Sequence, residues 1–166
     1  MYPRPVVLIT CIDSSGKPNI IPMAWTMPTS FDPPLIAISM ALKRYSHKLI
    51  TETREFVINI PSKKLAKQID YLGSVSGKDI DKFKKSGLTA SPAKSVKPPL
   101  INECIGHLEC ELVLKLETGD HMIFVGKVVV AEALKDIFKT DYDLDKAQMI
   151  LRHKKKYLIL DKYLHF

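Results

Sequence analysis

Residues 39–47 gather the side chains best suited to hold an anionic ligand. They read Ser-Met-Ala-Leu-Lys-Arg-Tyr-Ser-His and lead from an apolar stretch into the start of an expected helix. Lys43 and Arg44 are fixed cations, hydroxyls are nearby, and the first turn of a helix has N–H groups without intrahelical acceptors. Arginine can also hold phosphate through two parallel hydrogen bonds. The segment predicts an anion site; the alternative is that Ser46 is a plain helix cap with solvated neighbours.

The sequence lacks the common motifs for other chemistries. With seven glycines, it contains neither G-x-G-x-x-G nor G-x-x-x-x-G-K-[ST], so a phosphate would be held by side chains and a helix N-terminus. The histidines and cysteines show no metal-ligand spacing, and no G-x-S-x-G is present, so we expect no metal site. Cys11, Cys104 and Cys110 lie in apolar segments and are interpreted as small buried residues, with a reactive thiol as the alternative.

Composition is that of an ordinary globular protein. We expect one domain over residues 1–166, of which 46% are hydrophobic. No apolar run approaches the roughly 20 residues of a membrane helix, and no signal peptide is recognisable, so we expect a cytoplasmic protein without membrane contact. The net charge of +7 and the basic run at residues 152–156 leave a nucleic-acid-binding module as an alternative. No RNA- or DNA-binding motif accompanies the charge, so we expect no nucleic-acid partner.

Hydrophobic patterning predicts strands at both ends of the chain and helices between them. We expect strands at 6–12, 20–25, 35–40, 55–60, 107–117, 122–133 and 157–160, helices at 46–53, 62–72, 78–86 and 143–152, and a surface loop at 91–99. In the strand at 107–117, even-numbered residues from Leu108 to Leu116 are apolar and odd-numbered ones are polar, with Val113 the only exception. Without βαβ alternation, an antiparallel barrel or α+β sheet is favoured over a doubly wound fold.

Seven short stretches, in order, resemble the flavin-reductase-like family with the FMN-binding split barrel, which includes flavoredoxins and archaeal ferric-reductase-type proteins. They are PVVLIT (5–10), GKPN (16–19), AWT (24–26), SFDPP (30–34), EFVINIP (55–61), SGKDIDKF (76–83) and GDH (119–121). The resemblance covers residues 3 to 130. It implies a mainly β fold, a six-stranded antiparallel Greek-key split β-barrel with short inserted α-helices. It also implies a homodimer with FMN near the subunit interface.

The resemblance further implies which residues bind the cofactor. Met27, Pro28, Thr29 and Ser30 would line the flavin ring and ribityl chain, and Asn59 would end its strand beneath the flavin. Ser39, Met40, Lys43, Arg44, Ser46 and His47 belong to the segment that would hold the ribityl phosphate. Ser76, Gly77, Lys78, Lys82 and Phe83 would cover the ring edge.

His121 is the one residue expected to act on the electron donor. In the family, the Gly-Asp-His corner faces the nicotinamide side of the flavin, so His121 would position the donor; the alternative is a turn histidine that caps Asp120. Trp25 is interpreted as a core residue more readily than as a stacking partner. The implied function is NAD(P)H-dependent reduction of flavin or another small acceptor such as a ferric chelate. The alternative is a flavoredoxin-type FMN electron carrier, reduced by a partner redox protein.

Overall fold

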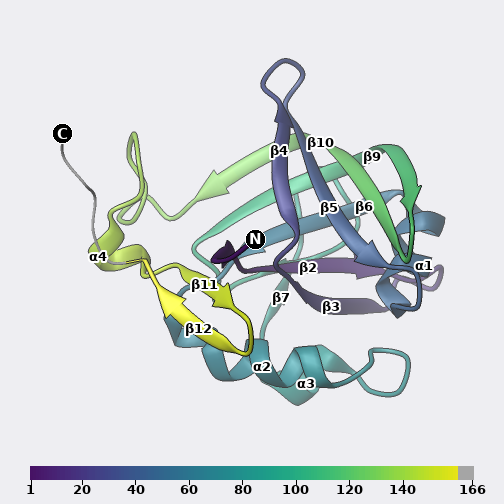
Figure 1. Ribbon diagram of the computed structural model, residues 1–166, viewed down its shortest axis with the longest axis horizontal. Helices are drawn as coiled ribbons and strands as arrows, with labels where there is room; N and C mark the ends of the chain where they lie inside the picture. The colour runs from purple at the N-terminus through teal and green to yellow at the C-terminus, as the bar shows by residue number, and fades with distance from the viewer. Residues whose placement is uncertain (161–166) are drawn as a thin grey trace.

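A curled antiparallel sheet forms the body of this protein, whose computed structural model describes residues 1–160 (Figure 1). Seven strands follow the order β3-β2-β6-β9-β10-β5-β4. Their bounds are β2 (Val7–Ile12), β3 (Pro18–Met23), β4 (Thr26–Ser30), β5 (Leu35–Ala41), β6 (Glu55–Ile60), β9 (Gly106–Thr118) and β10 (His121–Ala133). The antiparallel sheet and the few short helices confirm the mainly β fold that the resemblance implies.

The sheet has one strand more than the six expected. The strand predicted at 20–25 ends at Met23, and the chain resumes as a separate strand, β4, that pairs with β5. β3 and β4 are the two edges of the sheet, and they carry Pro18, Pro22 and Pro28. Proline lacks an N–H to donate and is tolerated at sheet edges, so these prolines fit their places.

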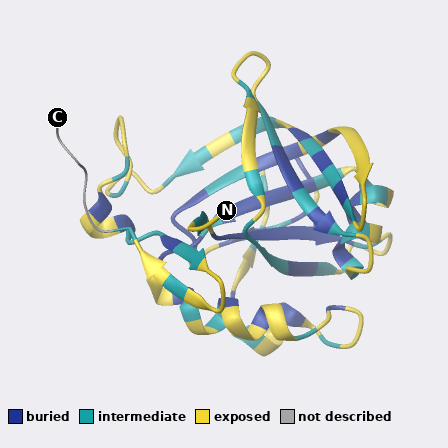
Figure 2. Ribbon diagram, viewed as in Figure 1, coloured by how far each residue is buried: buried dark blue, intermediate teal, exposed yellow. Residues whose placement is uncertain are grey.

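Two apolar cores lie on opposite sides of β2. Inside the curl, Ile9, Phe56 and Phe124 are fully buried. On the outside, Leu8 packs with residues of the helices that cover the sheet, including Leu72 and Phe83. Every residue of β2 is therefore buried, which accounts for the unbroken apolar run in its sequence (Figure 2).

The helices are short, and all but the first begin later than the sequence suggested. They are α1 (Tyr45–Thr53), the 3₁₀ turn η1 (Lys63–Leu65), α2 (Ala66–Ser74), α3 (Lys82–Ser86) and α4 (Leu144–Ala147). The predicted helix at 78–86 is thus confined to its second half, where Asp81 caps it by accepting a hydrogen bond from the Lys84 amide. No helix within residues 1–160 is long and apolar enough to span a membrane.

The helix predicted at 143–152 is wrong beyond its first turn. Gln148 adopts a left-handed backbone conformation, with φ of 44°, that ends α4. The chain continues as β11 (Ile150–His153) and β12 (Lys156–Ile159), and β11 pairs with β1 (Arg4–Pro5). Tertiary pairing of the two ends of the chain has overridden a local helical pattern. The short two-stranded sheet of β7 (Ala90–Ser91) and β8 (Leu100–Ile101) completes the fold.

A β-bulge at Val113 reverses the faces of β9. Leu112 pairs with Gly126 and Leu114 with Val125, so Val113 is the additional residue in its strand. Before the bulge, even-numbered residues point inward, and Cys110 and Leu112 are buried. After it, Leu114 and Leu116 point outward and are each 56% exposed. The predicted burial of these two leucines is therefore wrong, and the single exception in the pattern was the bulge itself.

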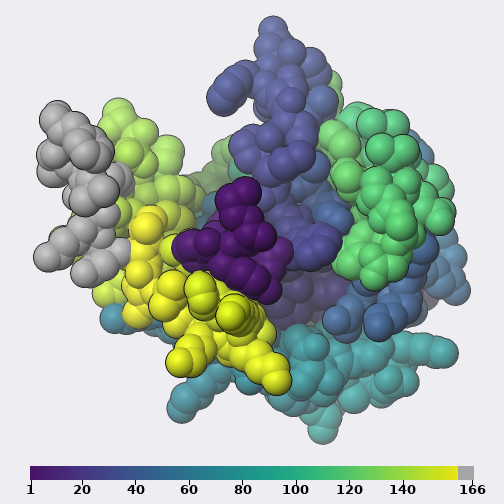
Figure 3. Space-filling view, in the orientation of Figure 1, coloured from purple at the N-terminus to yellow at the C-terminus, as the bar shows by residue number. Residues whose placement is uncertain are grey.

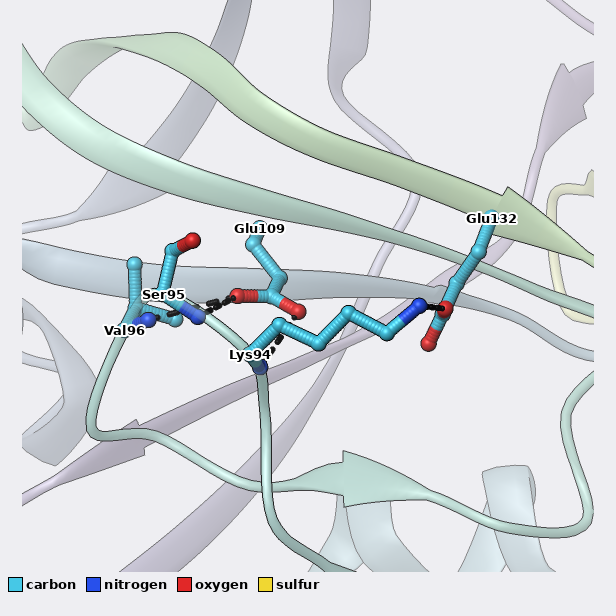
Figure 4. Close-up of polar contacts among 5 residues, drawn as sticks. All are labelled: Lys94, Ser95, Val96, Glu109 and Glu132. Carbon is cyan, nitrogen blue, oxygen red and sulfur yellow. Dashed lines mark hydrogen bonds and ion pairs between the residues drawn. The ribbon is translucent and has the colours of Figure 1, made fainter.

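Glu109, expected on the solvent face, is fully buried beneath the loop at 91–99. Its carboxylate accepts hydrogen bonds from the backbone amides of Lys94 (2.9 Å), Ser95 (2.7 Å) and Val96 (3.2 Å) (Figure 4). The ammonium of Lys94 also pairs with Glu132. The segment is the expected loop, and carboxylates of the barrel hold it at two places: Glu109 accepts from residues 94–96, and Glu55 of β6 accepts from the Lys97 amide over 2.9 Å.

We expect Glu109→Gln to lower the free energy of unfolding by about 1–3 kcal/mol, because the amide loses charge-assisted acceptance and faces amide donors with its own N–H₂. Urea denaturation measures this change. Glu111→Gln, an exposed neighbour on the same strand, is the control and should stay within about 0.5 kcal/mol of the wild type. Equal stability of the two variants would contradict the role of Glu109.

Candidate functional site

A cleft of about 490 Å³ opens between β3, the end of β5 and the loop that joins α2 to α3. This volume lies within the range of about 300–1,000 Å³ typical of small-molecule sites. Figure 3 shows the surface hollowed between the purple N-terminal strands, the teal helices and the green turn that joins β9 to β10. The cleft is lined by residues 19, 21–25, 39–41, 43–46, 72–77, 82 and 121.

The lining of this cleft carries cations without matching anions. Lys43 and Arg44 come from the turn after β5, and Lys82 begins α3. No aspartate or glutamate is among the described residues that line the cleft. Because like charges gathered without counter-ions repel one another, this arrangement favours an anionic ligand.

Lys82 is the most buried of these cations, with 4% of its surface exposed. Its ammonium donates a hydrogen bond to the carbonyl of Leu72 over 2.8 Å. Burial, followed by the nearby positive charge of Arg44, lowers the pKa of Lys82 to about 8. An anion in the cleft would remove this penalty.

The N-terminus of α1 faces the same cleft. Arg44 occupies the N-cap position, and no side chain in the described residues caps the helix. The expected cap, Ser46, lies instead inside the first turn, where its hydroxyl accepts a hydrogen bond from Asn19 over 2.7 Å. The N–H of His47 donates to the carbonyl of Arg44 over 3.0 Å, which leaves the N–H groups of Tyr45 and Ser46 available to an acceptor from outside the chain.

Asn19 forms part of the floor of the cleft and is 3% exposed. Its Nδ2 reaches Ser46, whereas its Oδ1 is buried without a hydrogen-bond partner among the described residues. Gly77 lies directly against this oxygen, since a Cβ at position 77 would come within 1.8 Å of Oδ1. The backbone of the loop at 74–77 thus approaches a buried acceptor that a ligand donor could satisfy.

An aromatic pair lies at the edge of the cleft. The rings of Trp25 and His121 stack with centroids 4.6 Å apart and planes inclined by 17°. Nδ1 of His121 lies 2.6 Å from a carboxylate oxygen of Asp120, and this hydrogen bond lowers the pKa of Asp120. Trp25, which is 46% exposed, is therefore not the core residue that the sequence favoured. Together, Trp25 and Asp120 fix the orientation of the His121 ring.

The structure brings together about half of the residues assigned from sequence. Lining the cleft are Ser39, Met40, Lys43, Arg44, Ser46, Ser76, Gly77, Lys82 and His121. Those outside its lining are Met27, Pro28, Thr29, Ser30, His47, Asn59, Lys78 and Phe83.

Two of the assigned residues that lie outside the cleft, Asn59 and His47, contact other parts of the barrel. The side chain of Asn59 is fully committed to the core, where it bonds Leu8, Thr10, Ile101 and His107. The ring of His47 packs 5.4 Å from that of Phe124, and desolvation, followed by the positive charge of Lys115, lowers the pKa of His47.

Several lining residues were missed because they carry no chemical motif. They are Asn19, Ile21, Pro22, Met23, Ala24, Ala41, Tyr45, Leu72, Gly73, Ser74 and Val75. Asn19 and the turn at 24–25 fell within stretches that carried the family resemblance, which was the available signal. Ala41 and Tyr45 belong to the segment at 39–47 that was predicted to bind an anion, and the remaining residues come from β3, α2 and the residue that follows α2.

The three cysteines are buried, free thiols, as interpreted from sequence. Burial raises the pKa of Cys11 to about 11 and that of Cys110 to about 12, and it raises the pKa of Cys104 as well. Thiols held in the protonated form are poor nucleophiles, so this environment does not favour thiol chemistry.

Comparison with known proteins agrees with this architecture. A family model described as a flavin reductase like domain matches residues 1–155. A protein of Archaeoglobus fulgidus is 40% identical over 129 residues, which are 78% of this chain and 72% of that protein. The flavoredoxin of Desulfovibrio vulgaris (Miyazaki F) has a TM-score of 0.92 and 29% identity, covering 100% of this chain and 91% of that chain. A flavoredoxin from Methanosarcina acetivorans has a TM-score of 0.90 and 28% identity, with coverages of 100% and 89%.

Lys82 should make the stability of the ligand-free protein depend on pH. The folded protein releases this proton near pH 8, whereas the unfolded chain keeps it to about 10.5, so the free energy of unfolding should rise across this window. We expect wild type to gain about 1–3 kcal/mol relative to Lys82→Met between pH 7 and pH 10, measured by urea denaturation.

Lys84→Met, which removes an exposed lysine from the same helix, is the control and should keep a constant difference from wild type. A constant difference for Lys82→Met as well would contradict the assigned shift.

Proposed function

Because the chain belongs to the flavin reductase-like family, we propose that it binds FMN in this cleft and transfers electrons from NAD(P)H to flavin or another small acceptor, such as a ferric chelate. The observation that carries the proposal is the group of cations in the cleft, with no carboxylate among its described lining residues. FMN is a phosphate monoester, and its reduced ring carries negative charge. Its phosphate and its reduced ring are therefore two negatively charged groups that the cations of the cleft would attract.

The phosphate would be held at the turn between β5 and α1. Arg44 offers a planar pair of donors, Lys43 adds a point charge, and the uncapped N-terminus of α1 supplies backbone N–H groups. Ser39 lines the cleft at the end of the neighbouring strand and offers a hydroxyl. Each of these is a donor or a cation, as a phosphate dianion requires.

The floor of the cleft suits the remainder of the cofactor. Oδ1 of Asn19 is a buried acceptor that lacks a donor, and the flavin ring and ribityl chain both carry N–H or O–H donors. Lys82 places a buried positive charge in the same cleft, where it would stabilise negative charge on a reduced ring. The residues present therefore fit FMN.

When bound, FMN accepts a hydride and releases electrons singly or in pairs, so the difficult chemistry belongs to the cofactor. The chain's own residues would bind the cofactor, orient the electron donor and stabilise the charge on the reduced ring. Lys82 and Arg44 favour the negatively charged form electrostatically, and the buried floor limits access of water. His121, held by Trp25 and Asp120 at the edge of the cleft, would position the donor. No acid–base pair is needed for this role.

A second copy of the chain would cover the apolar row that the bulge at Val113 turns outward. Met27, Ala37, Val125 and Leu114 pair in one row across β4, β5, β10 and β9, and Met27 and Leu114 are each more than half exposed. Ser39 of the cleft pairs with Ile123 in the next outward row, so a homodimer formed here would bring its partner close to the cofactor. Sedimentation velocity tests this pairing, and a monomer at micromolar concentrations would contradict it.

The similarity to two flavoredoxins favours a second candidate within the same chemistry, an FMN electron carrier reduced by another redox protein. Steady-state oxidation of NADH and NADPH, with free FMN or a ferric chelate as acceptor, separates the two. Fast turnover supports the reductase. Slow turnover combined with rapid reduction by a ferredoxin-like protein supports the carrier.

The phosphate assignment predicts that Lys43→Ala combined with Arg44→Ala weakens FMN binding by about 2–5 kcal/mol, because both cations are lost from one anion site. The protein contains a single tryptophan, Trp25, so quenching of its emission by added FMN reports the dissociation constant. The double variant Lys48→Ala with Lys64→Ala removes two exposed cations elsewhere and should bind FMN as the wild type does.

Two results would count against this assignment. Unchanged affinity in the Lys43/Arg44 variant would remove the phosphate site from the β5–α1 turn. A purified wild-type protein that is colourless and does not bind added FMN would reject the proposed function itself.

The assignment of His121 predicts that His121→Ala retains FMN and is reduced by NAD(P)H at least about tenfold more slowly, because the donor is no longer oriented on the flavin. Anaerobic stopped-flow bleaching of the flavin absorbance measures this rate. Glu117→Gln, an exposed change on the same hairpin, serves as the control. Equal reduction rates in wild type and His121→Ala would show that the histidine is only a turn residue.

A further inference from the structure

A second cavity, of about 370 Å³, adjoins the flavin cleft. The two share lining residues at 22–24 and at 73–74, so they form one continuous trough along β3 and the end of α2. The walls that belong to the second cavity alone include Asp70 of α2 and Arg152 and Tyr157 of the C-terminal hairpin. The FMN assignment leaves this cavity without an occupant.

Arg152, which lines the second cavity, lies directly opposite Arg4, which is not itself among the residues that line either cavity. Arg4 of β1 pairs with Arg152 of β11, and Arg152 pairs in turn with Tyr157 of β12. Directly opposed residues of antiparallel strands project from the same face, so this row of three side chains shares one side of the small sheet. Figure 3 shows the purple N-terminal residues against the yellow hairpin that carries Arg152.

Opposed like charges destabilise a pair of strands unless an anion lies between them. No carboxylate within residues 1–160 forms an ion pair with Arg4 or Arg152, and Nε of Arg4 is buried without a hydrogen-bond partner in that range. Asp70 is the one acid in the lining, and it lies within hydrogen-bonding reach of the Tyr157 hydroxyl. Arg152 is partly engaged, since its Nε donates to the carbonyl of Lys154 and its guanidinium lies 4.7 Å from the ring centroid of Tyr157. The unmet donor of the pair is Nε of Arg4, and neither guanidinium has an ion-pair partner within residues 1–160.

Arg4 connects Arg152 to the donor side of the flavin cleft. The guanidinium of Arg4 lies 4.2 Å from the ring centroid of Tyr2 and 5.3 Å from that of Trp25. Trp25 stacks on His121, the residue assigned to position the donor. A ligand that reaches from His121 along Trp25 would bring its far end to Arg4 and Arg152.

We propose that the Arg4–Arg152 pair and the second cavity bind a phosphate group of the nicotinamide dinucleotide that reduces the flavin. This inference rests on the proposed function and extends it to the donor's nucleotide end. Guanidinium pairs suit phosphate oxygens, and the shared trough gives an extended donor a path between the two cavities. The phosphate is either the 2′-phosphate of NADPH or the pyrophosphate common to both dinucleotides.

The test is calorimetric titration of the FMN-loaded protein with NADP⁺ and with NAD⁺. We expect Arg152→Gln and Arg4→Gln each to raise the dissociation constant of NADP⁺ about tenfold, as for loss of one charged contact, without changing that of FMN. If only NADP⁺ is weakened, the arginines hold the 2′-phosphate; if NAD⁺ is weakened equally, they hold the pyrophosphate. Circular dichroism confirms that each variant is folded.

Lys155→Gln is the matched control, because it removes one exposed cation from the tip of the same hairpin. Unchanged binding of both dinucleotides in the arginine variants, or an equal loss in Lys155→Gln, would overturn the proposal. If the wild type fails to bind FMN, the proposed function fails separately. The anion site is then tested with 2′,5′-ADP on the flavin-free chain, where equal affinities of wild type and Arg152→Gln would reject it.

Discussion

The uncompensated positive charge of the cleft is the constraint on which the rest of the site depends. Arg44 and Lys82 come from separate helices, yet they lie close enough for Arg44 to lower the pKa of Lys82. The burial of Lys82 costs stability in the ligand-free protein, and an anionic ligand offsets that cost. The ligand-free protein is therefore less stable than it would be without the buried lysine, and the anionic ligand binds more tightly because of it. Such a loss of stability is common where function requires a buried charge.

One contact of the barrel anchors the turn that carries Lys43 and Arg44, and a close approach inside the barrel shapes its outer surface. Asn19 on β3 bonds Ser46 on α1, which joins the edge of the sheet to the start of the helix that carries the anion-binding turn. Gly126 permits the close approach on the inside, since a Cβ there would lie 2.6 Å from the ring of Phe56. The bulge beside it, at Val113, turns an apolar row outward near Ser39, so core packing and the outer surface depend on the same few residues.

The sequence predicted the features that depend on residues close together in the chain. Apolar runs, the basic turn at Lys43 and Arg44, and buried cysteines depend on neighbouring residues, and each was found. Lys82 entered only through the family resemblance, because nothing in a short helical pattern says that its lysine is buried. Asn59 and His47 lie outside the cleft lining for the opposite reason: their partners, Leu8 and Phe124, are distant in sequence, and a local pattern does not show these contacts.

The basic run at residues 152–156 shows the same limit most clearly. By composition it is one solvated charge cluster, and its lysines are indeed exposed. Pairing with β1, about 150 residues earlier, separates Arg152 from its neighbours, places it opposite Arg4 and turns it toward the trough. Five adjacent basic side chains thus have two environments. Long-range strand pairing fixes the direction of each side chain. The sequence of a basic run therefore does not show which of its residues faces a cavity.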